Sequence, residues 1–156
     1  MAYLPRERKI KTIAELAAVV SGLKKEGKTV VQAHGGFDLI HPAHIYHFER
    51  AKELGDVLMV SIVEDRFVHK GPGRPVFDER TRLEWLSALE IVDYVVLCGD
   101  VGPYNVIREV RPHFYVKGES CKPLLADPAS GLSEDKRVCE SAGTELRFTK
   151  ELEVHS

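Results

Sequence analysis

Apolar residues along the chain follow two alternating patterns, one with helical spacing and one typical of short β-strands. The clearest helical pattern follows Thr12, and Glu15 completes a capping box that marks where this helix begins. The pattern stops at Gly27, a residue that suits a helix C-terminus. Asp78 and Ser133 are suitable N-caps for two later helices. The predicted helices cover residues 13–26, 44–54, 79–89, 103–110 and 133–142.

Five short runs of β-favouring residues lie between these helices. The run VLMVSIV, residues 57–63, is almost entirely apolar, which is typical of a parallel strand covered on both faces. The predicted strands are 29–33, 57–63, 94–98, 113–117 and 144–148. Strands that alternate with helices favour right-handed crossovers and a parallel sheet between two helical layers. We therefore predict one α/β domain with a Rossmann-like, doubly wound, parallel five-stranded sheet.

The order of the strands decides which loops meet. We assume the doubly wound order 3-2-1-4-5, in which the chain changes direction between the first and fourth strands. Ligands bind outside the carboxyl ends of strands at such a point. Residues 35–44 follow the first strand, and Lys117 and Gly118 follow the fourth, so this order predicts that they share a crevice. Residues 68–77 and 118–131 are expected to be loops, because Gly and Pro interrupt both.

Composition excludes several classes of protein. The 156 residues, 44% of them hydrophobic, suit one globular domain, and the net charge of −2 provides no basic field for nucleic acid or membranes. The three cysteines, Cys98, Cys121 and Cys139, form no CxxC pair, so we expect reduced thiols. No apolar window approaches the length of a membrane span. We expect a cytoplasmic protein.

The stretch GGFDLIHPAH, residues 35–44, is where the chemistry is concentrated. Gly35 and Gly36 allow a ligand to approach the backbone, and a helix that begins near Ala43 directs its amide groups at the same place. Both features favour an anion site. His41 and His44 can donate hydrogen bonds to phosphate oxygens. Other basic residues that could reach the anion are Lys70, Arg74, Arg80, Arg82 and Lys117.

Each of these residues also has a structural explanation. A single histidine near a helix start is more commonly a capping or surface residue than a catalyst, and Arg80 can be a solvated helix residue. Zinc binding by His41, His44 and His47 is not favoured, because no cysteine or aspartate completes a catalytic set. The chain has no GxSxG elbow, P-loop or GxGxxG motif. Alignment of the substrates and electrostatic stabilisation therefore remain as the means of catalysis. We predict that no side chain of the protein ligates a metal ion.

The stretch resembles the signature G-[CT]-F-D-x-x-H-x-G-H of the cytidylyltransferase-like nucleotidyltransferases. The similarity continues through HFERAKELGDVLMVSIVEDRFV, KGPGRPVFDERTRLEWLSALEIVDYVV and RPHFYVKG, and covers about residues 28–150. The pattern is most similar to the D-glycero-β-D-manno-heptose 1-phosphate adenylyltransferases, which also occur fused to PfkB-type sugar kinases. Glycerol-3-phosphate cytidylyltransferase is the next most similar.

The resemblance implies roles for particular residues. Those matching catalytic positions are His41, His44, Lys70 and Arg82, and those matching nucleotide-binding positions are Gly35, Gly36, Phe37, Asp38, His41, His44, Lys117 and Gly118. Arg74 lies beside the Lys70 position, and we expect it to bind the phosphorylated acceptor. Arg80 and Thr81 replace the family's usual EQ before the arginine.

The implied activity is transfer of AMP from ATP to a sugar 1-phosphate such as a heptose 1-phosphate, with release of pyrophosphate. Mg²⁺ is expected to accompany the nucleotide. One alternative is a CTP-dependent enzyme that acts on glycerol 3-phosphate or a related polyol phosphate. Another is a non-catalytic nucleotide-binding or docking module. The resemblance also suggests a homodimer and fusion to a sugar kinase domain.

Two departures from the family pattern affect these expectations. Ala43 stands where the signature has glycine between the two histidines. Residues 1–27 are expected to form an N-terminal helical region, and residues 28–156 the nucleotidyltransferase domain. Family members also continue into an S-[ST]-T segment and a final helix, which we do not find in residues 28–156. We expect either a domain excised from a longer, kinase-fused protein or a phosphate site that has lost one part.

Overall fold

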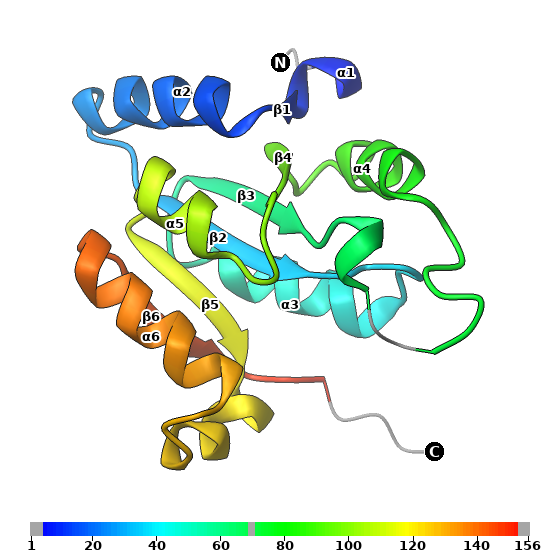
Figure 1. The fold of residues 1–156 in the computed structure, drawn as a ribbon. Helices are drawn as coiled ribbons and strands as arrows, with labels where there is room; N and C mark the ends of the chain where they lie inside the picture. Colours follow the sequence, from blue (N-terminus) through cyan, green and yellow to red (C-terminus); the bar gives the residue numbers. More distant parts are fainter. Residues whose placement is uncertain (1–4, 69–70, 153–156) are drawn as a thin grey trace.

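The computed structural model describes residues 5–68 and 71–152 (Figure 1). The helices are α1 (Arg6–Lys9), α2 (Ile13–Lys25), α3 (Pro42–Lys52), η1 (Asp65–Phe67), α4 (Glu79–Ser87), α5 (Tyr104–Val110), η2 (Glu119–Ala126) and α6 (Gly131–Ala142), where η marks 3₁₀ helices. The strands are β1 (Ile10–Lys11), β2 (Val30–Gly35), β3 (Val57–Ile62), β4 (Tyr94–Leu97), β5 (Phe114–Gly118) and β6 (Glu145–Thr149).

All these strands pair in parallel in one sheet with the order β1-β4-β3-β2-β5-β6. The predicted doubly wound order is therefore confirmed for β2 to β6. The prediction of five strands was wrong, because β1 adds a sixth at the edge beside β4. This strand has only two residues, which is too short for a period of two to be recognised.

Helices cover both faces of the sheet, as the apolar strands require. On one face, α3 and α4 contribute Phe48 and Leu86 to a single core cluster. On the other, Leu16 of α2 and Val106 of α5 belong to a second cluster, and α6 extends this layer over β5 through Val138. Figure 1 shows α3 behind the sheet and α5 and α6 in front of it. In the described part of the chain, no helix is long and apolar enough to cross a membrane.

The predicted helix starts at Thr12 and Asp78 are confirmed. The Thr12 side chain accepts from the Glu15 amide at 3.1 Å, and the Asp78 carboxylate accepts from the Thr81 amide at 2.8 Å. The predicted cap at Ser133 was wrong, because Ser130 caps α6 and accepts from the Ser133 amide. The 118–131 segment was predicted as a loop, but most of it forms η2.

Candidate nucleotide site

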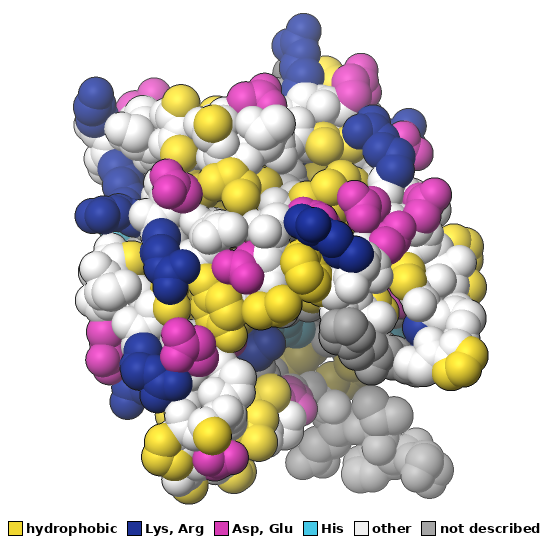
Figure 2. Space-filling model, in the orientation of Figure 1, with side chains coloured by type: hydrophobic (Ala, Val, Ile, Leu, Met, Phe, Trp, Pro, Cys, Tyr) yellow, Lys and Arg dark blue, Asp and Glu magenta, His cyan; other side chains and the backbone are white. Residues whose placement is uncertain are grey.

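A cleft of about 480 Å³ opens at the carboxyl ends of β2 and β5, where the sheet changes winding direction. The end of β2, the turn after it, the start of α3, the end of β5, η2 and residues 151–152 line this cleft. Figure 2 shows a hollow in this part of the molecule with histidine and basic side chains in its depth. The two segments predicted to share a crevice therefore do so.

His41 and His44 cap helix α3 by bonding to the backbone at its first turn. His41 is the N-cap residue, and its Nδ1 accepts from the Ala43 amide at 3.2 Å. The Nδ1 of His44 accepts from the His41 amide at 3.3 Å, and the two ring centroids are 4.0 Å apart. Because each Nδ1 acts as an acceptor, a neutral ring carries its proton on Nε2. Both residues also line the cleft.

Phe37 fixes the turn between β2 and α3. It has a φ of +50°, in the left-handed region that few non-glycine residues adopt, and its side chain is buried. Its ring packs edge-on against His44 with the ring centroids 5.5 Å apart, and against Phe48 with the centroids 5.2 Å apart. A Cβ on Gly35 would lie 2.9 Å from the Phe37 ring. Gly35 is therefore required by the packing that orients His44, in addition to the ligand access expected from the sequence.

Asp38 anchors the loop that precedes α4. Its carboxylate accepts from the amides of Val76 at 2.7 Å and Phe77 at 2.8 Å, and pairs with Arg74 at 3.3 Å. Burial would raise the pKa of Asp38, but these bonds outweigh burial and hold the pKa below its usual value. Asp38 thus joins two loops and does not line the cleft that contains His41.

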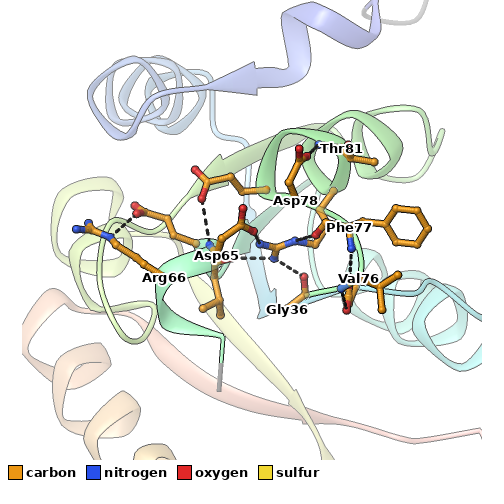
Figure 3. Close-up of polar contacts among 12 residues, drawn as sticks. Gly36, Asp65, Arg66, Val76, Phe77, Asp78 and Thr81 are labelled. Atoms are coloured by element: carbon orange, nitrogen blue, oxygen red, sulfur yellow. Dashed lines mark hydrogen bonds and ion pairs between the residues drawn. The ribbon is translucent and has the colours of Figure 1, made fainter. Parts of the chain in front are cut away.

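Arg82 is fully buried and holds three segments together (Figure 3). Its guanidinium donates to the carbonyls of Gly36 at 2.8 Å, Val63 at 2.7 Å and Phe77 at 3.1 Å. It also pairs with the Asp65 carboxylate at 2.7 Å. These bonds fix the turn after β2 from beneath. Arg82 borders a separate cavity of about 110 Å³ together with Asp38, and not the larger cleft.

Lys117 lines the cleft from the end of β5, the strand beside β2. Gly118 follows it and leaves room for Glu151, because a Cβ at this position would lie 2.1 Å from the Glu151 Oε1. The Glu151 carboxylate accepts from the Ser120 amide at 2.8 Å, and its hydrogen bonds with Ser120 lower the pKa of Glu151. Residues 151–152 therefore close one side of the cleft.

Two histidines in the cleft were not selected from the sequence as site residues. The His47 Nδ1 lies 2.8 Å from the Thr149 hydroxyl, and the His34 Nδ1 lies 2.9 Å from the Ser61 hydroxyl. Burial, followed by the positive charge of Lys117, lowers the pKa of His34 to about 3 and the pKa of His47 to about 4. The signal for His47 was its spacing of three residues from His44 on one helix. His34 was hidden because the first strand was expected to end at Ala33.

The structure thus brings together most of the predicted ligand-binding residues. Those that line the large cleft are Gly35, Gly36, Phe37, His41, His44, Lys117 and Gly118. Asp38, Arg74 and Arg82 lie in the supporting network beside it. Lys70 lies outside the described residues. The catalytic, nucleotide-binding and acceptor-binding roles assigned to these residues stay predictions.

The cleft suits an anion better than a bare metal ion. Its polar side chains are mainly imidazoles and an ammonium group, which donate to phosphate oxygens. Among the described residues, no group of three histidines, cysteines or carboxylates could hold a metal ion. Glu151 is the acidic side chain among the described residues that line the cleft. A Mg²⁺ ion here would take most of its oxygen ligands from bound phosphates, as this ion commonly does.

Residues 33–141 match the cytidylyltransferase-like family, and the chain belongs to this family. The match spans most of the sheet, the two histidines of α3 and the end of β5. It confirms the family expected from GGFDLIHPAH, and with it the enzyme class, a nucleotidyltransferase domain.

Among individual proteins, the chain is similar to the bifunctional protein HldE of two bacteria. It is 40% identical to that of a Nitratiruptor species over 76% of this chain and 26% of the relative. It is 40% identical to that of Methylococcus capsulatus over 93% of this chain and 30% of the relative. The chain thus spans about a quarter to a third of the length of these relatives.

Solved structures show the same fold. A lipopolysaccharide core biosynthesis protein from Thermoplasma volcanium GSS1 superposes with a TM-score of 0.63 at 27% identity, over 83% of this chain and 100% of that one. Pantoate-beta-alanine ligase from Francisella tularensis superposes with a TM-score of 0.62 at 15% identity, over 93% of this chain and 67% of that one. The second likeness concerns the fold alone.

Proposed function

We propose that the chain is the nucleotidyltransferase domain of a bifunctional protein and transfers AMP from ATP to a sugar 1-phosphate, such as a heptose 1-phosphate. The observation that carries this proposal is the arrangement of His41, His44 and Lys117 around one cleft at the switch point of the sheet. The 40% identity to HldE proteins and the sequence resemblance to heptose 1-phosphate adenylyltransferases support the choice of nucleotide and acceptor.

The reaction needs no protein nucleophile. A phosphate oxygen of the acceptor attacks the α-phosphorus of ATP, the bond between the α-phosphorus and the bridging oxygen breaks, and pyrophosphate leaves with its electron pair. The protein must align two anions and stabilise the charge that grows on the transferring and leaving phosphates. Mg²⁺, when bound with the nucleotide, would neutralise part of that charge.

The residues of the cleft suit these tasks. The Nε2–H groups of His41 and His44 can donate to the phosphates, and the positive end of α3 is directed at the same place. Lys117 can neutralise phosphate charge from the end of β5. Arg82 supports this chemistry indirectly, since it holds the Gly36 carbonyl and so the turn from which His41 follows.

Pyrophosphate release tests the proposal directly. The chain is incubated with ATP, CTP, GTP or UTP against a panel of sugar 1-phosphates and polyol phosphates, and pyrophosphate is followed with a coupled enzyme. We expect the highest kcat/KM with ATP and a sugar 1-phosphate. A preference for CTP with glycerol 3-phosphate would identify the alternative activity and reject the proposed one.

A non-catalytic module gives a different result. Calorimetry would then show nucleotide binding, while no pair of substrates releases pyrophosphate, even with a chain extended beyond Ser156.

Lys117→Ala tests the cleft itself, and Lys25→Ala is its matched control. Lys25 is exposed at the end of α2, just before β2 begins. It therefore lies near the amino ends of the strands, whereas the cleft lies at their carboxyl ends. Only Lys117→Ala should reduce turnover.

A further inference from the structure

A row of polar side chains lies under the cleft, inside a sheet that is otherwise apolar. Gln32 of β2 and Ser61 of β3 are fully buried, and His34 follows on the same face of β2. Strands of a parallel sheet are typically apolar on both faces, so this row is an exception, and the buried Gln32 Oε1 within it has no hydrogen-bond partner among the described residues. This row ends at the cleft, because His34 is one of the residues that line it.

Hydrogen bonds link the three side chains of the row. The Gln32 side-chain amide donates to the Ser61 hydroxyl at 2.8 Å, so this hydroxyl already accepts one bond. Its own proton can go to the His34 Nδ1 at 2.9 Å or to the Ala33 carbonyl at 3.5 Å. The shorter contact is well within hydrogen-bond range and the longer one is marginal. In the tautomer of His34 that carries its proton on Nε2, Ser61 donates to Nδ1.

Cys98 lies beside the same atom. Its sulfur is 3.3 Å from the His34 Nδ1, and burial raises the pKa of Cys98 to about 12, so the thiol keeps its proton. Burial lowers the pKa of His34 to about 3, so the ring is neutral and carries a single proton. An Nδ1 that accepts from Ser61 has no proton of its own, and the ring proton is then on Nε2.

His34 also lies next to Lys117. Ala33 pairs with Val116 across β2 and β5, so the residues that follow them, His34 and Lys117, are neighbours at the carboxyl ends of the two strands. Both line the cleft. The contacts of the His34 ring with the Ser61 hydroxyl and the Cys98 sulfur both use Nδ1, so Nε2 is the ring nitrogen that a ligand in the cleft would contact.

We propose that His34 is a further nucleotide-binding residue, which donates its Nε2–H to a phosphate oxygen of the nucleotide beside Lys117. This inference rests on the proposed function, since it takes the ligand to be a nucleoside triphosphate. The ring is uncharged, and its Nδ1 contacts Ser61 and Cys98. Unlike a surface histidine, it keeps the same protonation throughout the neutral pH range.

Two substitutions separate ligand binding from support of the sheet. The side-chain amide of Asn reaches the position of Nδ1, whereas that of Gln reaches the position of Nε2. His34→Asn should keep the bond to Ser61 but bind ATP and α,β-methylene-ATP about tenfold to a hundredfold more weakly, the range for a hydrogen bond to a charged group. His34→Gln should bind within about threefold of the wild type. Calorimetry measures the affinities, and urea unfolding at about pH 7.5 measures the stability of each variant.

The outcomes separate cleanly. Wild-type affinity in His34→Asn overturns the inference, as do equal losses of affinity in both variants that follow their losses of stability. The proposed function fails in a different way, when the wild-type chain binds ATP but releases no pyrophosphate with any acceptor. A wild-type chain that binds no nucleotide overturns both.

The ¹⁵N chemical shifts of the His34 ring give a readout that is independent of activity. We expect an unprotonated Nδ1 and a protonated Nε2 in the free protein, with a change at Nε2 when α,β-methylene-ATP is added. Ser61→Ala should move part of the proton to Nδ1. A protonated Nδ1 in the wild type, or an Nε2 resonance that does not respond to bound nucleotide, overturns the inference.

Discussion

The start of α3 and the start of α4 both carry basic residues of the family pattern, but the structure uses them differently. At α3, His41 and His44 bond the backbone through Nδ1 and line the cleft. At α4, Arg82 is fully buried, and its bonds go to three carbonyls and Asp65. A basic residue in a family's pattern can therefore support a site by holding its backbone in place, without lining the cleft. The following substitutions test this contrast.

Arg82→Ala should have the largest effect, on stability. It leaves three carbonyls and the Asp65 carboxylate without their donor. Each buried acceptor left unsatisfied typically costs about 1–3 kcal/mol, so we expect a loss of about 3 kcal/mol or more. Urea unfolding gives the free energy of unfolding. Arg80→Ala is the matched control on the same helix, because Arg80 is exposed and pairs with Glu84 across one turn. The control should change stability by about 0.5 kcal/mol or less. Equal effects in the two variants would contradict the supporting role of Arg82.

His44→Asn should have the opposite profile. The Asn amide can replace the Nδ1 contact with the His41 backbone but cannot reach the position of Nε2. We expect kcat to fall about 10²-fold to 10³-fold, the usual effect of removing one donor to a charged transition state, while the unfolding free energy stays near that of the wild type. His44→Ala should lose the same activity and also part of the cap, about 1 kcal/mol. Near wild-type turnover in both variants would remove His44 from the catalytic group.

The buried histidines His34 and His47 should make stability depend on pH, an effect of intermediate size. The pKa values of His34 and His47 are lowered to about 3 and about 4, whereas an unfolded chain has histidine pKa values near about 6.5. Between these values the unfolded state binds more protons than the folded state, so stability is full above about pH 6.5 and is lost as the pH falls toward about 4. Unfolding in urea at about pH 7.5, 6 and 5 measures the loss.

His47→Asn is the variant that tests this titration. The Asn side chain reaches the position of Nδ1 and can keep a bond to the Thr149 hydroxyl, but it does not titrate, so the loss of stability on acidification should be shallower than in the wild type. An unchanged pH dependence in this variant would show that His47 is not one of the groups responsible.

Arg74→Ala should have the smallest effect on stability. It tests whether Arg74 binds the acceptor or only supports the loop before α4. Its ion pair with Asp38 is 3.3 Å long and the Arg74 side chain is 42% exposed, so its removal should change stability by less than about 1 kcal/mol. If Arg74 binds the acceptor, the KM for the sugar phosphate rises while the KM for ATP does not. Unchanged values of both would leave Arg74 with a role in the loop alone.

Most of the fold was predictable, because it depends on local patterns. The apolar runs at 57–63 and 94–98 form strands β3 and β4, and Thr12 and Asp78 start helices as expected. The wrong predictions have physical causes. β1 consists of two residues whose pairing with β4 depends on tertiary contact, and η2 contains Pro123 within a stretch whose composition is typical of a loop.

The candidate site was predictable in part. The glycines and histidines of residues 35–44 and Lys117 could be placed in one crevice because strand order determines which loops meet. The buried bonds of Arg82 could not be foreseen, since its partners come from three separate segments. The position of His34 depended on β2 extending to Gly35, and strand ends are poorly determined by sequence patterns.

The mutual cap formed by the two imidazoles of α3 has a consequence for how this helix tolerates change. Since the ring at position 41 secures the amide of residue 43, and the ring at position 44 secures the amide of residue 41, neither substitution is independent of the other. Their energetic effects should be non-additive, with a double replacement less damaging than the sum of the single ones. The helix start therefore behaves as one cooperative unit, which a sequence retains or loses as a whole.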